Sequence, residues 1–442
     1  MAAAQAGDFS KKTFKTFLLR VLTQLFTIGA GIIVARSLGP EGKGLYTYAA
    51  TVLTLLVTLG SGASASVSRQ YGRQNKPSGV VYAAMMRFFF VVCLPIAALL
   101  AAAAVLTHQP VLLAPAFAFP FAYINQVSVG FSLADGNVGF ANVQGLAVSI
   151  ALAIVAAVLC YGLHLSVGAV LGGWVVVNAA VCVYSLFNIS KYARNSGSAA
   201  ERVQAFREQC SFGFRVTFNQ LLGLLNYQVD IFIVLYMLGH AALGRYSIAV
   251  GVGMMMWHLS RPLTVTSYSS MTRGTQQEAA RMTLLCVRHA ILSVGVASIV
   301  LAFVGPWLLQ LVYGPAFAVA GRALQLLLPG IVAYCTVPFF SQYFTLQLGK
   351  PQINTVVIAT STLVCAAVTI LLIHQYGIAA GAIGTSVSYT AAFIICTFVF
   401  CRQTGVAPGA LFAFTGNDLQ QYRLLAQWIL SGMRSTYVRR GG

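Results

Sequence analysis

Long apolar segments separated by short polar ones run along the whole chain. Each holds about 20 residues or more with few charges, the length that an α-helix needs to cross the hydrocarbon core of a membrane. The pattern predicts an all-α integral membrane protein with about 12 transmembrane helices. The expected spans are 14–36, 45–67, 80–106, 111–133, 142–162, 167–189, 213–238, 246–270, 283–312, 324–348, 353–374 and 379–401.

The composition excludes a soluble globular protein. Only 8% of the 442 residues are charged, whereas soluble domains carry about 25%. The nine cysteines form no CxxC pair, so the sequence indicates neither a zinc site nor a disulfide framework. It also holds no P-loop or HExxH motif and no clustered pair of carboxylates. We therefore expect a protein that is not an enzyme and uses no cofactor.

The basic residues predict the orientation of the chain. With the N-terminus in the cytoplasm, 23 of the 27 lysines and arginines lie on the cytoplasmic side, and only Arg36, Lys43, Arg245 and Arg322 lie outside. This split follows the positive-inside rule, so both termini are predicted to be cytoplasmic. Topology accounts for most of the net charge of +19, and no nucleic-acid partner is expected. The first apolar segment resembles a signal peptide, but many spans follow it, so we expect a retained helix.

An internal repeat divides the chain. Residues 32–52 and 232–252 are identical at eight of 21 positions, including Gly39/Gly239 and Gly44/Gly244. The repeat predicts two pseudo-symmetric six-helix bundles, which share one orientation because six is even, around a central cavity. The predicted domains are an N-terminal bundle (1–189), a basic cytoplasmic linker (190–212), a C-terminal bundle (213–401) and a cytoplasmic tail (402–442).

Two stretches outside the spans are predicted to lie at the membrane interface. Residues 199–209 carry two arginines and two glutamates and follow the first bundle. Residues 418–433 place apolar side chains on one helical stripe, with arginines elsewhere. Such a helix can lie on the cytoplasmic leaflet with its arginines near anionic lipids, or it can bind a protein partner.

Two basic residues within spans are candidates for binding an anionic group. Arg20 shares a helical face with Gln24, and Arg261 lies one turn beyond His258 and beside Pro262. Charges inside a membrane are costly and tend to face a cavity, and an arginine fork donates two hydrogen bonds to phosphate at once. The alternatives are arginines that extend to the interface and a histidine that packs in the core.

Asp230 is the acidic residue that lies deep in a predicted span. It shares a helical face with Asn226. We expect this pair either to bind a coupling cation or to serve as a structural partner for a nearby arginine.

Several segments resemble bacterial polysaccharide flippases of the Wzx type. They occur in order along nearly the whole chain: ARSLGPEGKGLYTYAATV (35–52), QVDIFIVLYMLGHAALGRYSIA (228–249), LVYGPAFAVAGRALQLLLPG (311–330), QLGKPQINTVV (347–357) and YGIAAGAIGTSVSY (376–389).

This resemblance implies the fold of the multidrug/oligosaccharidyl-lipid/polysaccharide flippases. Such a protein would move an undecaprenyl-pyrophosphate-linked oligosaccharide from the cytoplasmic to the periplasmic leaflet of the bacterial inner membrane by alternating access. Its partners would be membrane lipids and the polymerase and co-polymerase proteins of polysaccharide synthesis. Related flippases have cationic central cavities, but no family motif fixes the arginines, so Arg20 and Arg261 rest on their placement in the spans.

Two other functions remain open at this point. A cation-coupled drug antiporter of the same superfamily would need acidic residues in its cavity, and here Asp230 stands among bases. A scaffold or polymerase component of a polysaccharide assembly complex would usually carry a large outer loop, which the sequence lacks, although the predicted C-terminal helix suits a scaffold.

Overall fold

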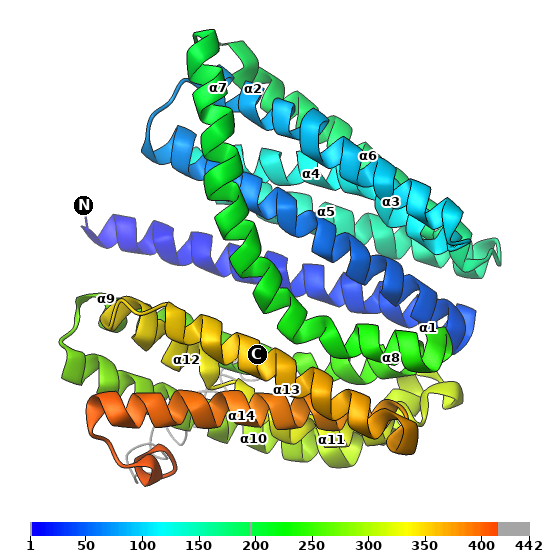
Figure 1. Ribbon diagram of the computed structural model, residues 1–442, viewed down its shortest axis with the longest axis vertical. Coiled ribbons are helices and arrows are strands. Elements are labelled where there is room, and N and C mark those ends of the chain that lie inside the picture. The colour runs from blue at the N-terminus through cyan, green and yellow to red at the C-terminus, as the bar shows by residue number, and fades with distance from the viewer. Residues whose placement is uncertain (1, 195–196, 414–442) are drawn as a thin grey trace, which may run out of the picture. The chain divides into compact units, whose positions relative to one another are not determined.

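A computed structural model describes residues 2–194 and 197–413 of the chain (Figure 1). These residues form helices and connecting turns without strands. The helices are α1 (Ala2–Val67), α2 (Ser78–Phe88), α3 (Leu94–Leu106), α4 (Leu113–Ala134), α5 (Val138–Ala157), α6 (Val167–Ser190), α7 (Ala199–Glu208), α8 (Phe214–Met254), α9 (Trp257–Arg273), α10 (Gln276–Tyr313), α11 (Ala320–Tyr334), α12 (Val337–Gln342), α13 (Gln352–Tyr376) and α14 (Ile378–Thr404).

Short segments of other helix types join or extend these α-helices. The described residues include five π-helical segments, which are η1 (Ser68–Arg73), η2 (Phe89–Cys93), η4 (Val158–Gly162), η6 (Gln209–Gly213) and η8 (Tyr343–Gln347). The 3₁₀ segments are η3 (Pro110–Leu112), η5 (Lys191–Arg194), η7 (Pro315–Phe317) and η9 (Pro408–Leu411).

Ten helical segments of the described chain are long and apolar enough to cross a membrane. Two of them are too long for a single span: Leu18–Arg73 has 56 residues and Ala199–Thr264 has 66. At 1.5 Å per residue, straight helices of these lengths would measure about 84 and 99 Å, against a hydrocarbon core of about 30 Å. Each therefore has the length of more than one span. The predicted all-helical membrane fold is confirmed.

A glycine interrupts each of these long segments. Gly39 in α1 has φ 67° and ψ −171°, and Gly239 in α8 has φ 82° and ψ −178°. This backbone region is almost restricted to glycine because a Cβ would clash there. Figure 1 shows α1 doubling back. Counting one span on each side of each break brings the ten segments into agreement with the expected twelve.

The contacts group the chain into two compact units. The larger unit comprises Met1–Ala249, Pro306–Ala323 and Thr369–Gly381, and the smaller comprises Val250–Gly305, Leu324–Val368 and Ala382–Gly442. The domain boundaries that the repeat suggests, at 1–189 and 213–401, remain a prediction.

Helix α4 forms the centre of the core in the larger unit. Its Phe119, Tyr123, Val127 and Phe131 follow one another at helical spacing and are all fully buried. They pack α4 against α1, α3 and α6. The Tyr123 hydroxyl donates a hydrogen bond to the Met85 carbonyl at 3.2 Å, so its polar end is satisfied inside the apolar core.

An aromatic cluster joins three helices in the smaller unit. The ring centroid of Tyr334 on α11 lies 4.2 Å from that of Tyr389 on α14 and 5.6 Å from that of Trp257 on α9. Close helix packing accompanies this cluster, since a Cβ on Gly330 would lie 2.4 Å from the Cα of Ser386.

The two stretches predicted to be interfacial have different outcomes. Residues 199–208 form α7, whose start carries a capping box: the Ser198 side chain accepts from the Glu201 amide, and the Glu201 side chain accepts from the Ser198 amide. This reciprocal pair satisfies backbone donors that a helix start leaves unpaired. The predicted helix at 418–433 lies outside the described residues.

Candidate functional site

The two copies of the repeat meet at their glycines in the larger unit. A Cβ on Gly44 would lie 1.8 Å from the His240 carbonyl oxygen, and a Cβ on Gly244 would lie 1.9 Å from the Pro40 carbonyl oxygen. Positions 40 and 44 correspond to 240 and 244, so each copy presents a glycine to the same carbonyl of the other. Such reciprocal contact is the mark of a twofold arrangement.

A hydrogen bond lies beside this glycine crossing, the contact of Gly44 with the His240 carbonyl and of Gly244 with the Pro40 carbonyl. The Thr47 hydroxyl donates to the Ser247 hydroxyl at 3.2 Å, and these residues also occupy equivalent positions. The crossing is short and close-packed because small side chains allow the backbones to approach. It holds the segments that follow the Gly39 and Gly239 breaks against one another.

Asp230 lies next to the second break and is almost fully buried, with 2% of its surface exposed. Its carboxylate accepts a hydrogen bond from the Tyr246 hydroxyl and another from the Ile231 amide at 2.9 Å. Sixteen residues of straight helix would separate Asp230 and Tyr246 by about 24 Å. Their contact exists because the chain folds back at Gly239.

The buried Tyr246 is held by a glycine of its own. A Cβ on Gly381 would lie 2.9 Å from the Tyr246 ring and 3.2 Å from its hydroxyl oxygen. Only a residue without a side chain fits there, so the phenol is fixed in the position from which it reaches Asp230. Tyr246 is not among the site residues predicted from the sequence, and its identity with Tyr46 in the repeat is the signal that points to it.

Asn226 lies one helical turn before Asp230 and is equally buried at 2%. Side chains four residues apart share a face of a helix, so the predicted pairing of these residues on one face holds. Carboxylate and amide oxygens are the ligands that hard cations prefer. Among the described residues, no group of three or more His, Cys, Asp or Glu could hold a metal ion.

Arg20 and Gln24 lie in the first span of the larger unit, and both side chains are exposed. Neighbouring hydroxyls fix the rotation of this part of α1 against α5. The Thr27 hydroxyl donates to Ser149 at 3.3 Å, and the Asn142 amide donates to Thr16 at 3.1 Å. Arg20 and Gln24 are therefore available to a ligand or to lipid headgroups.

His258 and Arg261 lie on α9 in the smaller unit, and both are exposed. Helix α9 begins at Trp257 after a turn and contains Pro262. The structure thus keeps His258 and Arg261 within one turn of each other, and Arg20 and Gln24 likewise. Each pair is placed only within its own unit.

Two arginines assigned to the outer side have structural roles. The Arg36 Nε donates to the Val312 carbonyl at 2.7 Å, and the Arg245 Nε donates to the Ala316 carbonyl at 3.2 Å. Val312 lies in the last turn of α10, where a cation satisfies unpaired carbonyls, and Ala316 lies in the following 3₁₀ segment η7. Arg36 and Arg245 are therefore held within the fold.

The family follows from the sequence. Residues 9–273 match the family described as polysaccharide biosynthesis protein. The chain belongs to this family. A search of curated protein sequences finds no match.

Solved structures with the same fold are transporters. The lipid II flippase MurJ, in an inward closed conformation, superposes with a TM-score of 0.72 at 12% identity, covering 96% of this chain and 99% of that one. An inward-facing multidrug-resistance MATE transporter of the MOP superfamily superposes with a TM-score of 0.67 at 14% identity, covering 89% of this chain and 96% of that one. At these identities the likeness concerns the fold, which is that of a multi-pass membrane transporter.

Proposed function

We propose that this protein flips an undecaprenyl-pyrophosphate-linked oligosaccharide repeat unit from the cytoplasmic to the periplasmic leaflet of the bacterial inner membrane by alternating access. The product would supply the synthesis of cell-surface or exported polysaccharide. The observation that carries the proposal is the family match over residues 9–273. The similarity to a lipid II flippase along nearly both whole chains supports it.

The charge balance favours an anionic cargo. Arg20 and Arg261, with Gln24 and His258, are proposed to contact the pyrophosphate, because guanidinium groups form paired, charge-assisted hydrogen bonds with phosphate oxygens. Their exposed side chains are compatible with this role. Polymerase and co-polymerase proteins are proposed partners that would consume the flipped repeat unit.

Asp230 is proposed to couple transport to a cation, with Asn226 beside it. Its carboxylate is buried yet held by hydrogen bonds from Tyr246 and the Ile231 amide. Acidic residues inside membrane spans mark ion pathways, and carboxylate and amide oxygens are the ligands that hard cations prefer.

A leaflet assay tests the flippase function. Proteoliposomes would contain the purified protein and a fluorescent lipid-linked oligosaccharide, and a membrane-impermeant glycosidase would report the fraction exposed outside. We expect the fraction of oligosaccharide that resists the glycosidase to fall with time in vesicles that contain the protein, and to stay constant in protein-free vesicles. An equal resistant fraction with and without the protein would contradict the proposal.

A cation-coupled drug antiporter is the second candidate, and the MATE neighbours favour it. In that case dye efflux from proteoliposomes would depend on an imposed cation gradient. We expect no such efflux, since an exporter of cationic drugs needs several acidic cavity residues and this chain has eight acids in all. Dye efflux together with unchanged lipid distribution would replace the flippase proposal by this one.

A further inference from the structure

A basic pocket of about 380 Å³ opens in the larger unit at one end of its helices. Arg69 and Gln70 of η1 line one side, and Arg207 and Glu208 of α7 line another. Phe212 of η6 and Arg215 at the start of α8 complete it. None of these residues belongs to the site proposed for the cargo.

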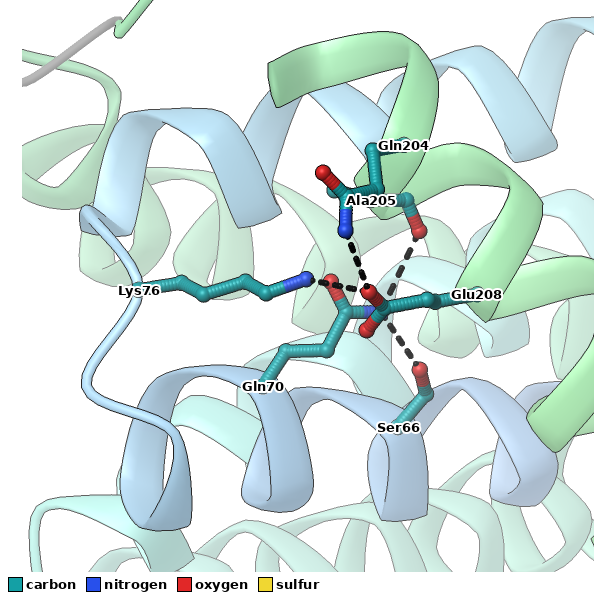
Figure 2. Close-up of polar contacts among 6 residues, drawn as sticks. All are labelled: Ser66, Gln70, Lys76, Gln204, Ala205 and Glu208. Atoms are coloured by element: carbon teal, nitrogen blue, oxygen red, sulfur yellow. Dashed lines mark hydrogen bonds and ion pairs between the residues drawn. The ribbon is translucent and has the colours of Figure 1, made fainter.

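Two hydrogen bonds from Gln70 hold the pocket together. Its side-chain amide, which is 1% exposed, donates to the Ser66 hydroxyl at 2.9 Å and to the Ala205 carbonyl at 3.2 Å. Figure 2 shows Gln70 reaching from α1 and η1 to α7 in this way. These two hydrogen bonds fix α7 across the end of the membrane span. The pocket is therefore part of the folded core rather than a gap between loops.

Close packing fixes the other side of the pocket. A Cβ on Gly62 would lie 2.6 Å from the Gly213 carbonyl oxygen and 2.2 Å from the Thr217 hydroxyl. Both backbone segments that contribute central residues, η1 and η6, are π-helical. A π-helical turn inserts one residue into a helix and re-aims the side chains around it, and such turns are frequent at functional sites.

The pocket carries uncompensated positive charge. Glu208 forms an ion pair with Lys76 at 2.8 Å and accepts from Gln204 at 3.3 Å, as Figure 2 shows. Its charge is therefore already balanced. In the described part of the chain, neither Arg69, Arg207 nor Arg215 forms an ion pair with a carboxylate.

Two of these arginines are oriented by neutral neighbours. The Arg69 guanidinium lies 4.5 Å from the centre of the Phe212 ring, and Arg215 donates to the Ser211 hydroxyl at 3.4 Å. A cation held over an aromatic face keeps donors for another ligand. Three guanidinium groups around one cavity are a recognition site for an oxyanion.

Exposed apolar side chains adjoin the pocket. Phe214 and Phe218, at the start of α8, are 65% and 50% exposed, and their rings stack at 6.2 Å. Aromatic side chains of this kind are typical where a membrane meets water. A ligand whose charged group fills the pocket would therefore carry an apolar portion along these rings.

We propose that the pocket formed by Arg69, Arg207 and Arg215 binds the phosphate of an anionic lipid headgroup. Basic pockets at the ends of membrane helices bind such headgroups. The site lies at the joint of α1, α7 and α8, so an occupied pocket would tie these helices to the surface of one leaflet.

Native mass spectrometry on the full chain tests this proposal. Protein purified in neutral detergent would be titrated with phosphatidylglycerol, phosphatidylcholine or inorganic phosphate. We expect phosphatidylglycerol to be retained at low concentration and the other two not. Each of Arg69→Gln, Arg207→Gln and Arg215→Gln should weaken retention roughly five- to tenfold, since each removes one charge near the lipid phosphate.

Arg73→Gln is the matched control, because Arg73 lies in the same π-helical segment, is exposed and does not line the pocket. It should retain phosphatidylglycerol as the wild type does. The site would be overturned if Arg73→Gln weakened phosphatidylglycerol retention as much as the pocket variants do. Normal retention by a variant that combines Arg69→Gln, Arg207→Gln and Arg215→Gln would overturn it as well. Retention of inorganic phosphate with no retention of phosphatidylglycerol would overturn the lipid as its ligand. Thermal unfolding without added lipid identifies any variant that fails to fold, and Met, a long side chain without charge, then replaces Gln at that position.

Discussion

The hydroxyls of Thr47 and Ser247 lie 3.2 Å apart although 200 residues separate them in the chain. The offset is that of the sequence repeat, so the two copies touch at the same position of each. In the same reciprocal way, Gly44 lies against the His240 carbonyl and Gly244 against the Pro40 carbonyl. The repeat is therefore a contact surface as well as a pattern in the sequence.

Substitution of the crossing glycines tests this surface. Gly44→Ala or Gly244→Ala places a methyl group against a backbone carbonyl, which cannot move aside as a flexible side chain can. We expect each to destabilise the protein by about 1–3 kcal/mol, as overpacking of a core does. Thermal unfolding in detergent measures the effect. Gly29→Ala is the matched control, since nothing lies within 4 Å of its Cβ position, and it should unfold no earlier than the wild type.

Substitution of the glycines at the breaks in α1 and α8 should also destabilise the protein, but through backbone strain rather than through a clash. A Cβ at Gly239 would meet nothing within 4 Å, but φ is 82°. Gly239→Ala should therefore cost about 1–3 kcal/mol through backbone strain alone. Gly223→Ala, in the same helix with equal space and no positive φ, should be harmless. Equal stability of the two variants in a thermal-unfolding assay would argue against the break.

Two conservative variants distinguish the contribution of Asp230 to transport from that of Tyr246 to stability. Asp230→Asn keeps the shape but removes the charge, so cation-coupled transport should fall at least about tenfold while the protein remains folded. Tyr246→Phe removes one hydrogen bond to a charged group and should cost about 1.5–3 kcal/mol of stability. Transport assays and thermal unfolding of both variants give the comparison. Wild-type transport by Asp230→Asn would leave this residue a structural role only.

The proposed anion ligands predict a selective loss of transport. Arg261→Ala and Arg20→Ala each remove charge-assisted hydrogen bonds of about 1.5–3 kcal/mol, so export should fall about tenfold or more at normal membrane abundance. Arg322→Ala serves as the control, because Arg322 is exposed and belongs to the side predicted to face outward. Unchanged polymer export in Arg261→Ala would remove that residue from the site.

Reporter fusions test the orientation inferred from the basic residues. Fusions in the connections near residues 108, 164 and 377 should report an outer location. The positive-inside rule places these connections, which carry no lysine or arginine, on the side opposite to both termini. Cytoplasmic activity at these positions would invert the predicted topology.

The helical spans could be predicted because hydropathy depends on segments of about 20 residues, and a membrane imposes that length. That a single glycine, Gly39 or Gly239, makes each break between helices could not be predicted, because the polar residues in 37–44 suggested a longer loop. Single-residue π insertions such as η1 could not be predicted either, because they leave the hydropathy pattern unchanged. Their location decides where Arg69 lies, so the basic pocket emerged only from the structure.

The candidate residues show a similar division. The spacing of four places Asn226 and Asp230 on one face of a helix, whereas their burial is shown only by the structure. The Tyr246 partner could not be predicted, since it depends on the chain folding back at Gly239. From the sequence, Arg36 and Arg245 are only charges on the outer side, whereas in the structure they donate to carbonyls of Val312 and Ala316. A one-dimensional pattern cannot show contacts made across spans.

The reciprocal glycine crossing also constrains how this sequence can change over generations. Two copies of a repeat would ordinarily be free to diverge, one retaining an ancestral residue while the other varied. A side chain at Gly44 or Gly244 would clash with the backbone of the other copy. The same contact therefore requires a glycine at both positions. Identity at Gly44 and Gly244 is thus what this contact requires, whereas positions of the repeat outside the contact carry no such requirement.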